Sequence, residues 1–240
     1  MNEQQESCRI WYEQSYFEQK FKAQRMYPNE ELCRFLGREY FCRISREERK
    51  DIRILEIGCG SCSNLWMIAR EGFDGYGLDL SAKAVELGKK MLISWGGINA
   101  HIQVASMCQL PYDTDSFDAV IDIFSSYCLC EDDLHICLDE VRRVLKSGGK
   151  FFSYTPSTNS DAFKKHKPSE KIDYWTLNGI TRKTSPYFGN DYPFRFISPK
   201  HYKELLKEYG FNITYLETAG RTYRNMKEYF EWVTIVGEKR

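Results

Sequence analysis

The sequence predicts an α/β domain with a mostly parallel sheet, and three stretches carry this prediction. The apolar run 52–57 suits a strand buried on both faces of a sheet, and Gly58 and Gly60 follow it at once. Short apolar stretches at 73–80 and 116–124 indicate two more strands, with helical patterns between them. Strands that alternate with helices in this way are typical of a parallel sheet with helices on both faces.

Length and composition indicate a single domain with additions. The chain has 240 residues, of which 42% are hydrophobic, enough for a sizeable core. The formal net charge is zero, so no global charge favours a nucleic acid or an anionic membrane as partner. No apolar run reaches membrane-spanning length, and the first residues lack the apolar core of a signal peptide. We therefore expect a cytoplasmic protein without nucleic-acid or membrane partners, and the oligomeric state is left open.

The nine cysteines predict free thiols rather than a disulfide framework. Their number is odd, and they fall inside apparent strands and helices. Cys59-Gly-Ser-Cys62 has the spacing of a redox motif, but it lies in the glycine loop, which makes a structural role the better interpretation. Cys128 and Cys130 lack a second close pair, so no zinc site is predicted.

The glycine loop has the features of a ligand-binding turn. Without a Cβ, Gly58 and Gly60 let the backbone turn tightly and approach a ligand closely. Ser63 is placed to cap a helix over 65–70. A dinucleotide fingerprint requires a third glycine where Ser63 stands. A nicotinamide-dependent oxidoreductase is therefore the less favoured alternative.

An acidic residue, Glu56, stands two positions before the first glycine. Glu56-x-Gly58-x-Gly60 resembles the first motif of the class I S-adenosylmethionine (SAM)-dependent methyltransferases, although Cys62 stands where many members have a third glycine. The resemblance implies a Rossmann-like, seven-stranded, mostly parallel sheet with helices on both faces and an antiparallel last strand. It also implies that SAM is the methyl donor and S-adenosylhomocysteine (SAH) the product.

The second half of the domain is similar to the ubiquinone/menaquinone C-methyltransferase-like branch of this family. Leu-Pro at 110–111 precedes Phe-Asp and an apolar strand at 117–123, and Arg-Val-Leu-Lys-Ser-Gly-Gly at 143–149 precedes the next strand. The resemblance covers 50–155 well and 198–240 loosely.

Several cofactor contacts follow from the resemblance. The carboxylate of Glu56 helps to hold the amino group of SAM, and Asp79 accepts hydrogen bonds from the two ribose hydroxyls. Ser106 replaces the acid that contacts the adenine amino group in relatives, and a hydroxyl can still accept there. Met107 either lies against the adenine or fills the core. The residues assigned to the cofactor are Glu56, Gly58, Cys59, Gly60, Asn64, Asp79, Leu80, Ser106, Met107 and Asp122.

Four segments organise the predicted chain. Residues 51–156 form the SAM-binding core, which 201–240 complete with a helix and strands. Residues 1–50 form a helical cap whose first helix is interpreted as a lid over the cofactor, the alternative being that it only covers an edge of the sheet. This segment holds the aromatic residues Trp11, Tyr12, Tyr16, Phe17, Phe21 and Tyr27.

The segment 157–200 is interpreted as an insertion that covers the substrate. It carries eight Lys/Arg against four Asp/Glu and is rich in aromatic residues. It follows the fifth strand, whose carboxyl end borders the crevice where such sheets bind ligands. The alternative is an excursion that packs only on itself. The composition favours an anionic or partly aromatic acceptor.

The sequence offers no clear general base. Tyr127, after the fourth strand, can orient a hydroxyl, but a phenol with a pKa of about 10 is a poor base at neutral pH. His166 lies in a lysine-rich run within the insertion, where a solvated face is the simpler interpretation. A small-molecule acceptor is the favoured interpretation, with the acceptor atom unresolved. A SAM-binding protein without catalysis, acting as a partner subunit, stays open.

Overall fold

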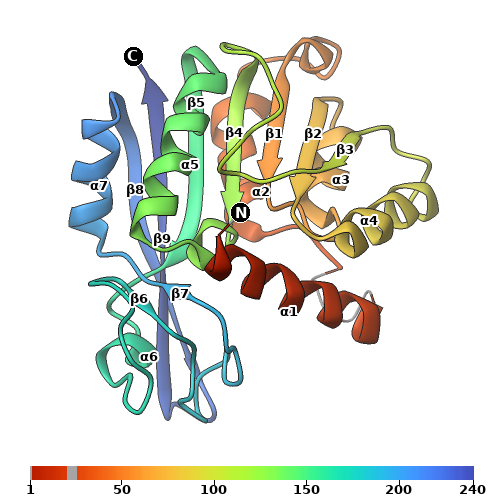
Figure 1. The fold of residues 1–240 in the computed structure, drawn as a ribbon. Coiled ribbons are helices and arrows are strands. Elements are labelled where there is room, and N and C mark those ends of the chain that lie inside the picture. The colour runs from red at the N-terminus through yellow and green to blue at the C-terminus, as the bar shows by residue number, and fades with distance from the viewer. Residues whose placement is uncertain (1, 21–25) are drawn as a thin grey trace.

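The computed structural model describes residues 2–20 and 26–240, which form a sheet of seven strands in the order β3-β2-β1-β4-β5-β9-β8 (Figure 1). Strands β1 to β5 are parallel, and β9 runs antiparallel between β5 and β8. The predicted fold class is thereby confirmed. The strands are β1 Arg53–Ile57, β2 Asp74–Asp79, β3 His101–Val104, β4 Phe117–Ile123, β5 Leu145–Pro156, β8 Phe211–Tyr223 and β9 Glu228–Lys239.

Helices cover both faces of this sheet because its central strands are apolar on both sides. On one face, Ile54 of β1 belongs to the cluster that contains Phe35 of the second helix. On the other face, Leu55 of β1 packs in a cluster with two later helices. The helices are α1 Glu3–Gln19, α2 Glu30–Leu36, α3 Ser63–Arg70, α4 Ala82–Ser94, α5 Glu131–Val144, α6 Asp161–Lys164 and α7 Pro199–Glu208, with shorter turns at Gly37–Phe41, Glu48–Asp51 and Ser126–Cys128.

Two segments gather at the carboxyl ends of the parallel strands. Helix α1 crosses beneath the ends of β4, β1 and β2, and the region between β5 and α7 lies beside it (Figure 1). That region contains α6 and a small antiparallel sheet of β6 (Thr176–Leu177) and β7 (Phe194–Arg195). Such carboxyl ends are where open α/β sheets bind ligands. Phe21 of the predicted cap lies outside the described residues.

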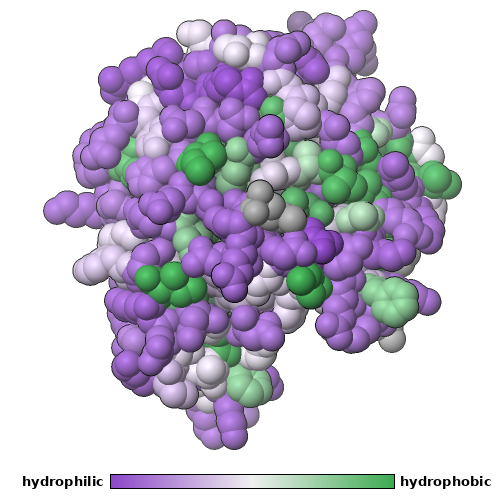
Figure 2. All heavy atoms as spheres, in the orientation of Figure 1, coloured by the Kyte–Doolittle hydropathy of each residue, from purple (hydrophilic) through white to green (hydrophobic). Residues whose placement is uncertain are grey.

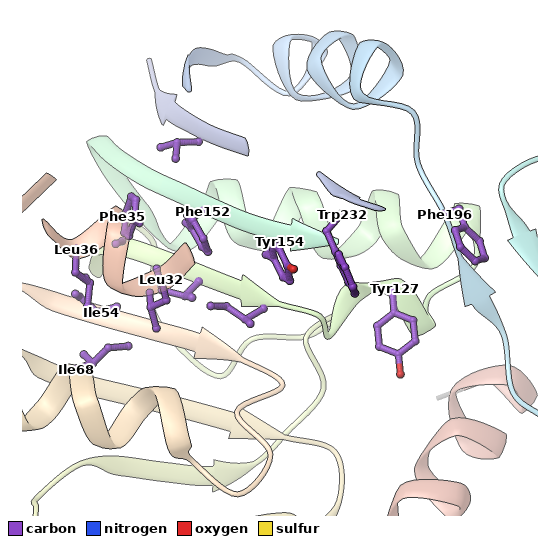
Figure 3. Packing of buried hydrophobic residues seen from close by; sticks show 14 of the residues in the cluster. Leu32, Phe35, Leu36, Ile54, Ile68, Tyr127, Phe152, Tyr154, Phe196 and Trp232 are labelled. Atoms are coloured by element: carbon purple, nitrogen blue, oxygen red, sulfur yellow. The ribbon is translucent and has the colours of Figure 1, made fainter. Parts of the chain in front are cut away.

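The segment 157–200 is packed into the main core. Phe194 and Phe196 are fully buried, and both belong to the same apolar cluster as Phe152 of β5. Figure 3 shows Phe196 and Trp232 continuing the row of buried side chains that starts at Phe35. This segment therefore contributes to the stability of the whole domain, and it cannot be excised as a separate unit.

The face drawn in Figure 2 is mostly hydrophilic, with apolar residues in small groups. Among the described residues, no helix has the length and apolar character needed to cross a membrane.

Candidate active site

The loop between β1 and α3 is shaped by two glycines with positive φ. Gly58 has a φ of 68° and Gly60 a φ of 52°, values that side chains other than glycine rarely adopt. A Cβ on Gly58 would lie 2.4 Å from the Cβ of Ser125, in the loop after β4. Glycine is therefore required at position 58 for the two loops to approach each other.

Cys62, rather than the predicted Ser63, precedes the first turn of α3. The helix begins at Ser63, and Cys62 has a left-handed φ of 67° without a side-chain cap. The prediction that Ser63 caps this helix was wrong because the chain enters the helix one residue earlier. Gly88 of α4 makes room for the thiol, since a Cβ there would lie 2.4 Å from the Cys62 sulfur.

The thiols are unpaired, as predicted. All nine cysteines lie within the described residues and none forms a disulfide. The sulfurs of Cys59 and Cys62 are 3.7 Å apart, beyond bonding distance. The hydrogen bond with the Cys62 thiol and burial raise the pKa of Cys59 well above its ordinary value, so Cys59 lacks the low thiol pKa of redox motifs.

A cavity opens at the carboxyl ends of β1, β2 and β4, and we call it the loop cavity. It encloses about 910 Å³, its mouth included, and the glycine loop forms one of its walls. Nine of the ten residues assigned to the cofactor line it. They are Glu56, Gly58, Cys59, Gly60, Asn64, Asp79, Leu80, Ser106 and Met107.

Glu56 places a partly unsatisfied carboxyl in the wall of the loop cavity. The side chain is 2% exposed, and its Oε1 accepts a hydrogen bond of 2.7 Å from Nδ2 of Asn64. Its Oε2 is buried and has no hydrogen-bond partner in the protein. Burial raises the pKa of Glu56 to about 8. A buried acceptor without a donor is costly, and a cationic amino group from a ligand would satisfy it.

Asp79, at the end of β2, is held by backbone amides. Its Oδ2 accepts from the amide of Gly60 and its Oδ1 from the amide of Ser81, both at 2.9 Å. Burial raises the pKa of Asp79 to about 6, so the carboxylate is the main form at neutral pH. An ionised carboxylate has about four lone-pair sites, which leaves acceptors for two ligand hydroxyls.

Ser106 and Met107 follow β3 and line the loop cavity. The Ser106 hydroxyl accepts a hydrogen bond of 3.1 Å from the amide of Cys108. Met107 is partly buried and also packs against an apolar cluster of the core. Met107 therefore packs against the core and also lines the cavity, and its contact with the adenine stays a prediction.

Asp122 was assigned to the cofactor, but it does not line the loop cavity. It is fully buried on β4. Its carboxylate accepts hydrogen bonds of 2.5–2.8 Å from the hydroxyls of Ser125, Ser126 and Ser153. Since Ser125 lines the cavity, the structure places Asp122 behind the wall, where it fixes the loop after β4.

Helix α1 supplies one wall of the loop cavity, and the residues that form this wall were not predicted individually from the sequence. Gln5, Cys8, Arg9, Tyr12 and Tyr16 all line the loop cavity. Their spacing of three and four residues puts them on one face of the helix. This helical period in the sequence could have identified them as neighbours. The helix is tied to the core at several points, among them a hydrogen bond of 2.5 Å from the Ser81 hydroxyl to Glu13.

A second cavity adjoins the first, and we call it the aromatic cavity. It encloses about 1020 Å³, its mouth included. Helix α1, the loop after β4 and the segment 157–200 all contribute to it. Its lining is Trp11, Tyr12, Ser63, Asn64, Ile123, Phe124, Tyr127, Tyr187, Asn190 and Tyr192, and five of these residues, Tyr12, Ser63, Asn64, Ile123 and Phe124, also line the loop cavity.

The two weak catalytic candidates have different positions. Tyr127 lies in the wall of the aromatic cavity, and Figure 3 shows its hydroxyl directed away from the row of core side chains. His166 lines neither cavity. Its Nδ1 lies 2.8 Å from the backbone oxygen of Ser169, in a local turn. The structure thus places Tyr127 in a cavity that adjoins the residues assigned to the cofactor, and it leaves His166 apart from them.

Comparison with known proteins agrees with this geometry. Residues 54–149 match the family described as a methyltransferase domain. Sterol 4-C-methyltransferase strm-1 of Caenorhabditis elegans is 29% identical over 155 residues, which are 63% of this chain and 44% of the relative. The tRNA N(3)-cytidine methyltransferase METTL6 of Rattus norvegicus is 26% identical over 184 residues, 72% of this chain and 62% of the relative. The chain spans less than two thirds of the length of either relative.

The fold agrees with the family match. A SAM-dependent methyltransferase structure from Methanosarcina mazei has a TM-score of 0.64 at 21% identity, covering 78% of this chain and 92% of that chain. At this identity the likeness shows the fold, and the match to a methyltransferase domain covers residues 54–149.

Proposed function

We propose that this protein transfers the methyl group of SAM to a small-molecule acceptor, with SAM in the loop cavity and the acceptor in the aromatic cavity. One observation carries the proposal, namely that the two cavities share a wall of five residues. SAM, when bound, supplies a methyl group that is already activated by a positively charged sulfur. Placement of the acceptor next to that methyl can then supply much of the rate, up to about 7–11 kcal/mol.

The residues of the chain have separate roles in this proposal. Glu56 receives the amino group through its unpaired Oε2, and Asp79 receives the ribose hydroxyls. Helix α1 and the segment 157–200 enclose the acceptor and exclude water, because Trp11, Tyr12, Tyr187 and Tyr192 line the aromatic cavity. The roles of the 1–50 cap and the 157–200 insertion as covers of the site are part of the same proposal.

RNA methylation is the second candidate function, since one relative is a tRNA methyltransferase. The formal net charge of zero disfavours it, because binding to phosphates usually requires a basic surface.

The proposal is tested by incubating the protein with SAM that carries a labelled methyl group. One arm contains a panel of small metabolites and the other contains purified tRNA. We expect label in a small molecule, with SAH formed in equal amount. Label in the tRNA would favour the second candidate. SAH binding without transfer to any acceptor would instead indicate a partner subunit without catalysis.

A further inference from the structure

The aromatic cavity has an unusual lining for a binding site. Six of its ten described lining residues are aromatic, and the others are a serine, an isoleucine and two asparagines. Within the described part of the chain, no Lys, Arg, His, Asp or Glu lines it. A ligand there meets aromatic rings, one aliphatic side chain and neutral hydrogen-bonding groups.

The basic residues of 157–200 do not serve this cavity, contrary to what the composition suggested. Arg182 pairs with Glu228 at 2.6 Å, and Arg195 pairs with Glu131 at 2.6 Å. Lys165 pairs with Asp161 at 2.9 Å within α6 and its end. The expectation of an anionic acceptor therefore loses its basis, because a carboxylate or phosphate in the cavity would be desolvated without a counter-ion.

A cationic acceptor is also disfavoured. Ring faces do attract cations. However, under the proposed function the adjoining loop cavity holds a sulfonium, and two positive charges in adjoining cavities repel each other. The shared wall of five residues keeps the two ligands close. An uncharged acceptor is the class that this pair of cavities fits.

Three tyrosine hydroxyls form a polar centre in the aromatic lining. The Tyr12 and Tyr127 hydroxyl oxygens are 2.5 Å apart, and those of Tyr12 and Tyr192 are 3.2 Å apart. The hydroxyls of Tyr127 and Tyr192 are also hydrogen-bonded. Three hydroxyls have three protons, and the three contacts among them can use all three. Each oxygen has two lone pairs, so the cluster keeps acceptor capacity for a ligand that donates a hydrogen bond.

These hydroxyls stay protonated at neutral pH. Burial raises the pKa of Tyr12, Tyr127 and Tyr192 above the ordinary value for a phenol. They therefore act as neutral hydrogen-bonding groups, and none is suited to hold a negative charge.

We propose that the acceptor is an uncharged, ring-bearing, mostly apolar molecule whose hydroxyl or N–H group is received by the Tyr12–Tyr127–Tyr192 hydroxyl cluster. This inference rests on the proposed function for the position of the sulfonium, and it names the substrate class of the same site. The rings of Trp11, Phe124 and Tyr187 contact the body of the acceptor, and the three hydroxyls fix its polar end.

Four naphthalene probes test the proposal by binding alone. They share one ring system and differ in the polar group: 2-naphthol, 2-naphthoate, 2-naphthylmethylammonium and naphthalene itself. Each is titrated by calorimetry into protein saturated with sinefungin, an unreactive SAM analogue that carries a positively charged amino group in place of the sulfonium. We expect 2-naphthol to bind at least about 3- to 10-fold more tightly than naphthalene, as one net hydrogen bond allows, and more tightly than both charged probes. Equal or tighter binding of a charged probe would overturn the proposal, as would failure of every probe to bind.

Matched variants assign the preference to the cluster. Tyr127→Phe and Tyr192→Phe each remove a hydroxyl and keep the ring, and both should reduce the preference for 2-naphthol over naphthalene by about 3- to 10-fold. Tyr209→Phe is the control, because its hydroxyl contacts His135 outside both cavities. An unchanged preference in both cluster variants would contradict the proposal. Thermal unfolding of each variant checks that it is folded. If one cluster variant fails to fold, the other still tests the proposal.

Two further outcomes are distinguishable. Displacement of bound 2-naphthol by tRNA would overturn the small-molecule class. Failure of SAH itself to bind would reject the proposed function instead, and the probe series on protein without sinefungin would still test the cavity.

Discussion

Asp79→Asn should weaken SAH binding by about 10- to 100-fold, the loss expected for a charge-assisted hydrogen bond of about 1.5–3 kcal/mol. The Asp79 carboxylate already accepts from the amides of Gly60 and Ser81, so it is held in place for a ligand without further ordering. An asparagine has one acceptor oxygen, and its NH₂ group would face one of these amide donors. Calorimetric titration at pH 7.5 measures the change in the dissociation constant.

Asp74→Asn is the matched control for this experiment. Asp74 begins the same strand at its opposite end and lies near Arg53 and His101, away from both cavities. It should leave SAH affinity unchanged. An unchanged dissociation constant for Asp79→Asn would mean that the ribose is held elsewhere. Wild-type affinity should also fall as the pH is lowered through about 6, because that is where burial places the pKa of Asp79.

Glu56→Gln should weaken SAH binding by about 10-fold and abolish a release of protons on binding. Burial raises the pKa of Glu56 to about 8, so the free protein carries this proton at pH 7. A cationic amino group next to Oε2 favours the ionised carboxylate, so binding of SAH expels the proton. About one proton should therefore be released per SAH bound. Titrations at pH 7 in buffers of different ionisation enthalpy measure this number. If the Gln variant released as many protons as the wild type, the assignment of Glu56 to the amino group would be contradicted.

The same substitution should stabilise the protein without ligand at alkaline pH. A carboxyl whose folded pKa lies above its ordinary value contributes stability that is complete below the ordinary value, 4.5, and is lost as the pH rises through the folded value of about 8. Gln has no charge to desolvate, and it can still accept from Asn64. Urea unfolding at pH 8 should show Glu56→Gln to be more stable than the wild type by about 1–3 kcal/mol. Lower stability at that pH would show that the carboxylate is not destabilising.

Local spacing was sufficient to predict which residues gather around the loop cavity. Glu56, Gly58 and Gly60 lie within one strand and its turn, and Asp79 ends the next strand, so the parallel topology alone brings them together. Asp122 shows the limit of this reasoning. The side chains of a strand alternate between its faces, and the sequence did not show that this carboxylate points behind the loop.

The aromatic cavity could be recognised only from the tertiary structure. Tyr12 and Tyr192 are separated by 180 positions, and Tyr127 lies 65 positions before Tyr192. Their hydroxyls meet because α1 and the segment 157–200 both fold over the carboxyl ends of the strands (Figure 1). The basic composition of 157–200 likewise did not predict the charge of the aromatic cavity. Arg182 and Arg195 each pair with an acidic residue that is distant in the sequence.

A parallel titration of the wild-type protein with SAH and with NADH tests the assignment of the loop cavity most directly. One SAH should bind per chain in the loop cavity, because Glu56 and Asp79 supply its acceptors and Ser63 stands where the dinucleotide fingerprint has its third glycine. NADH should give no heat of binding. Binding of NADH together with an absence of SAH binding would contradict this assignment.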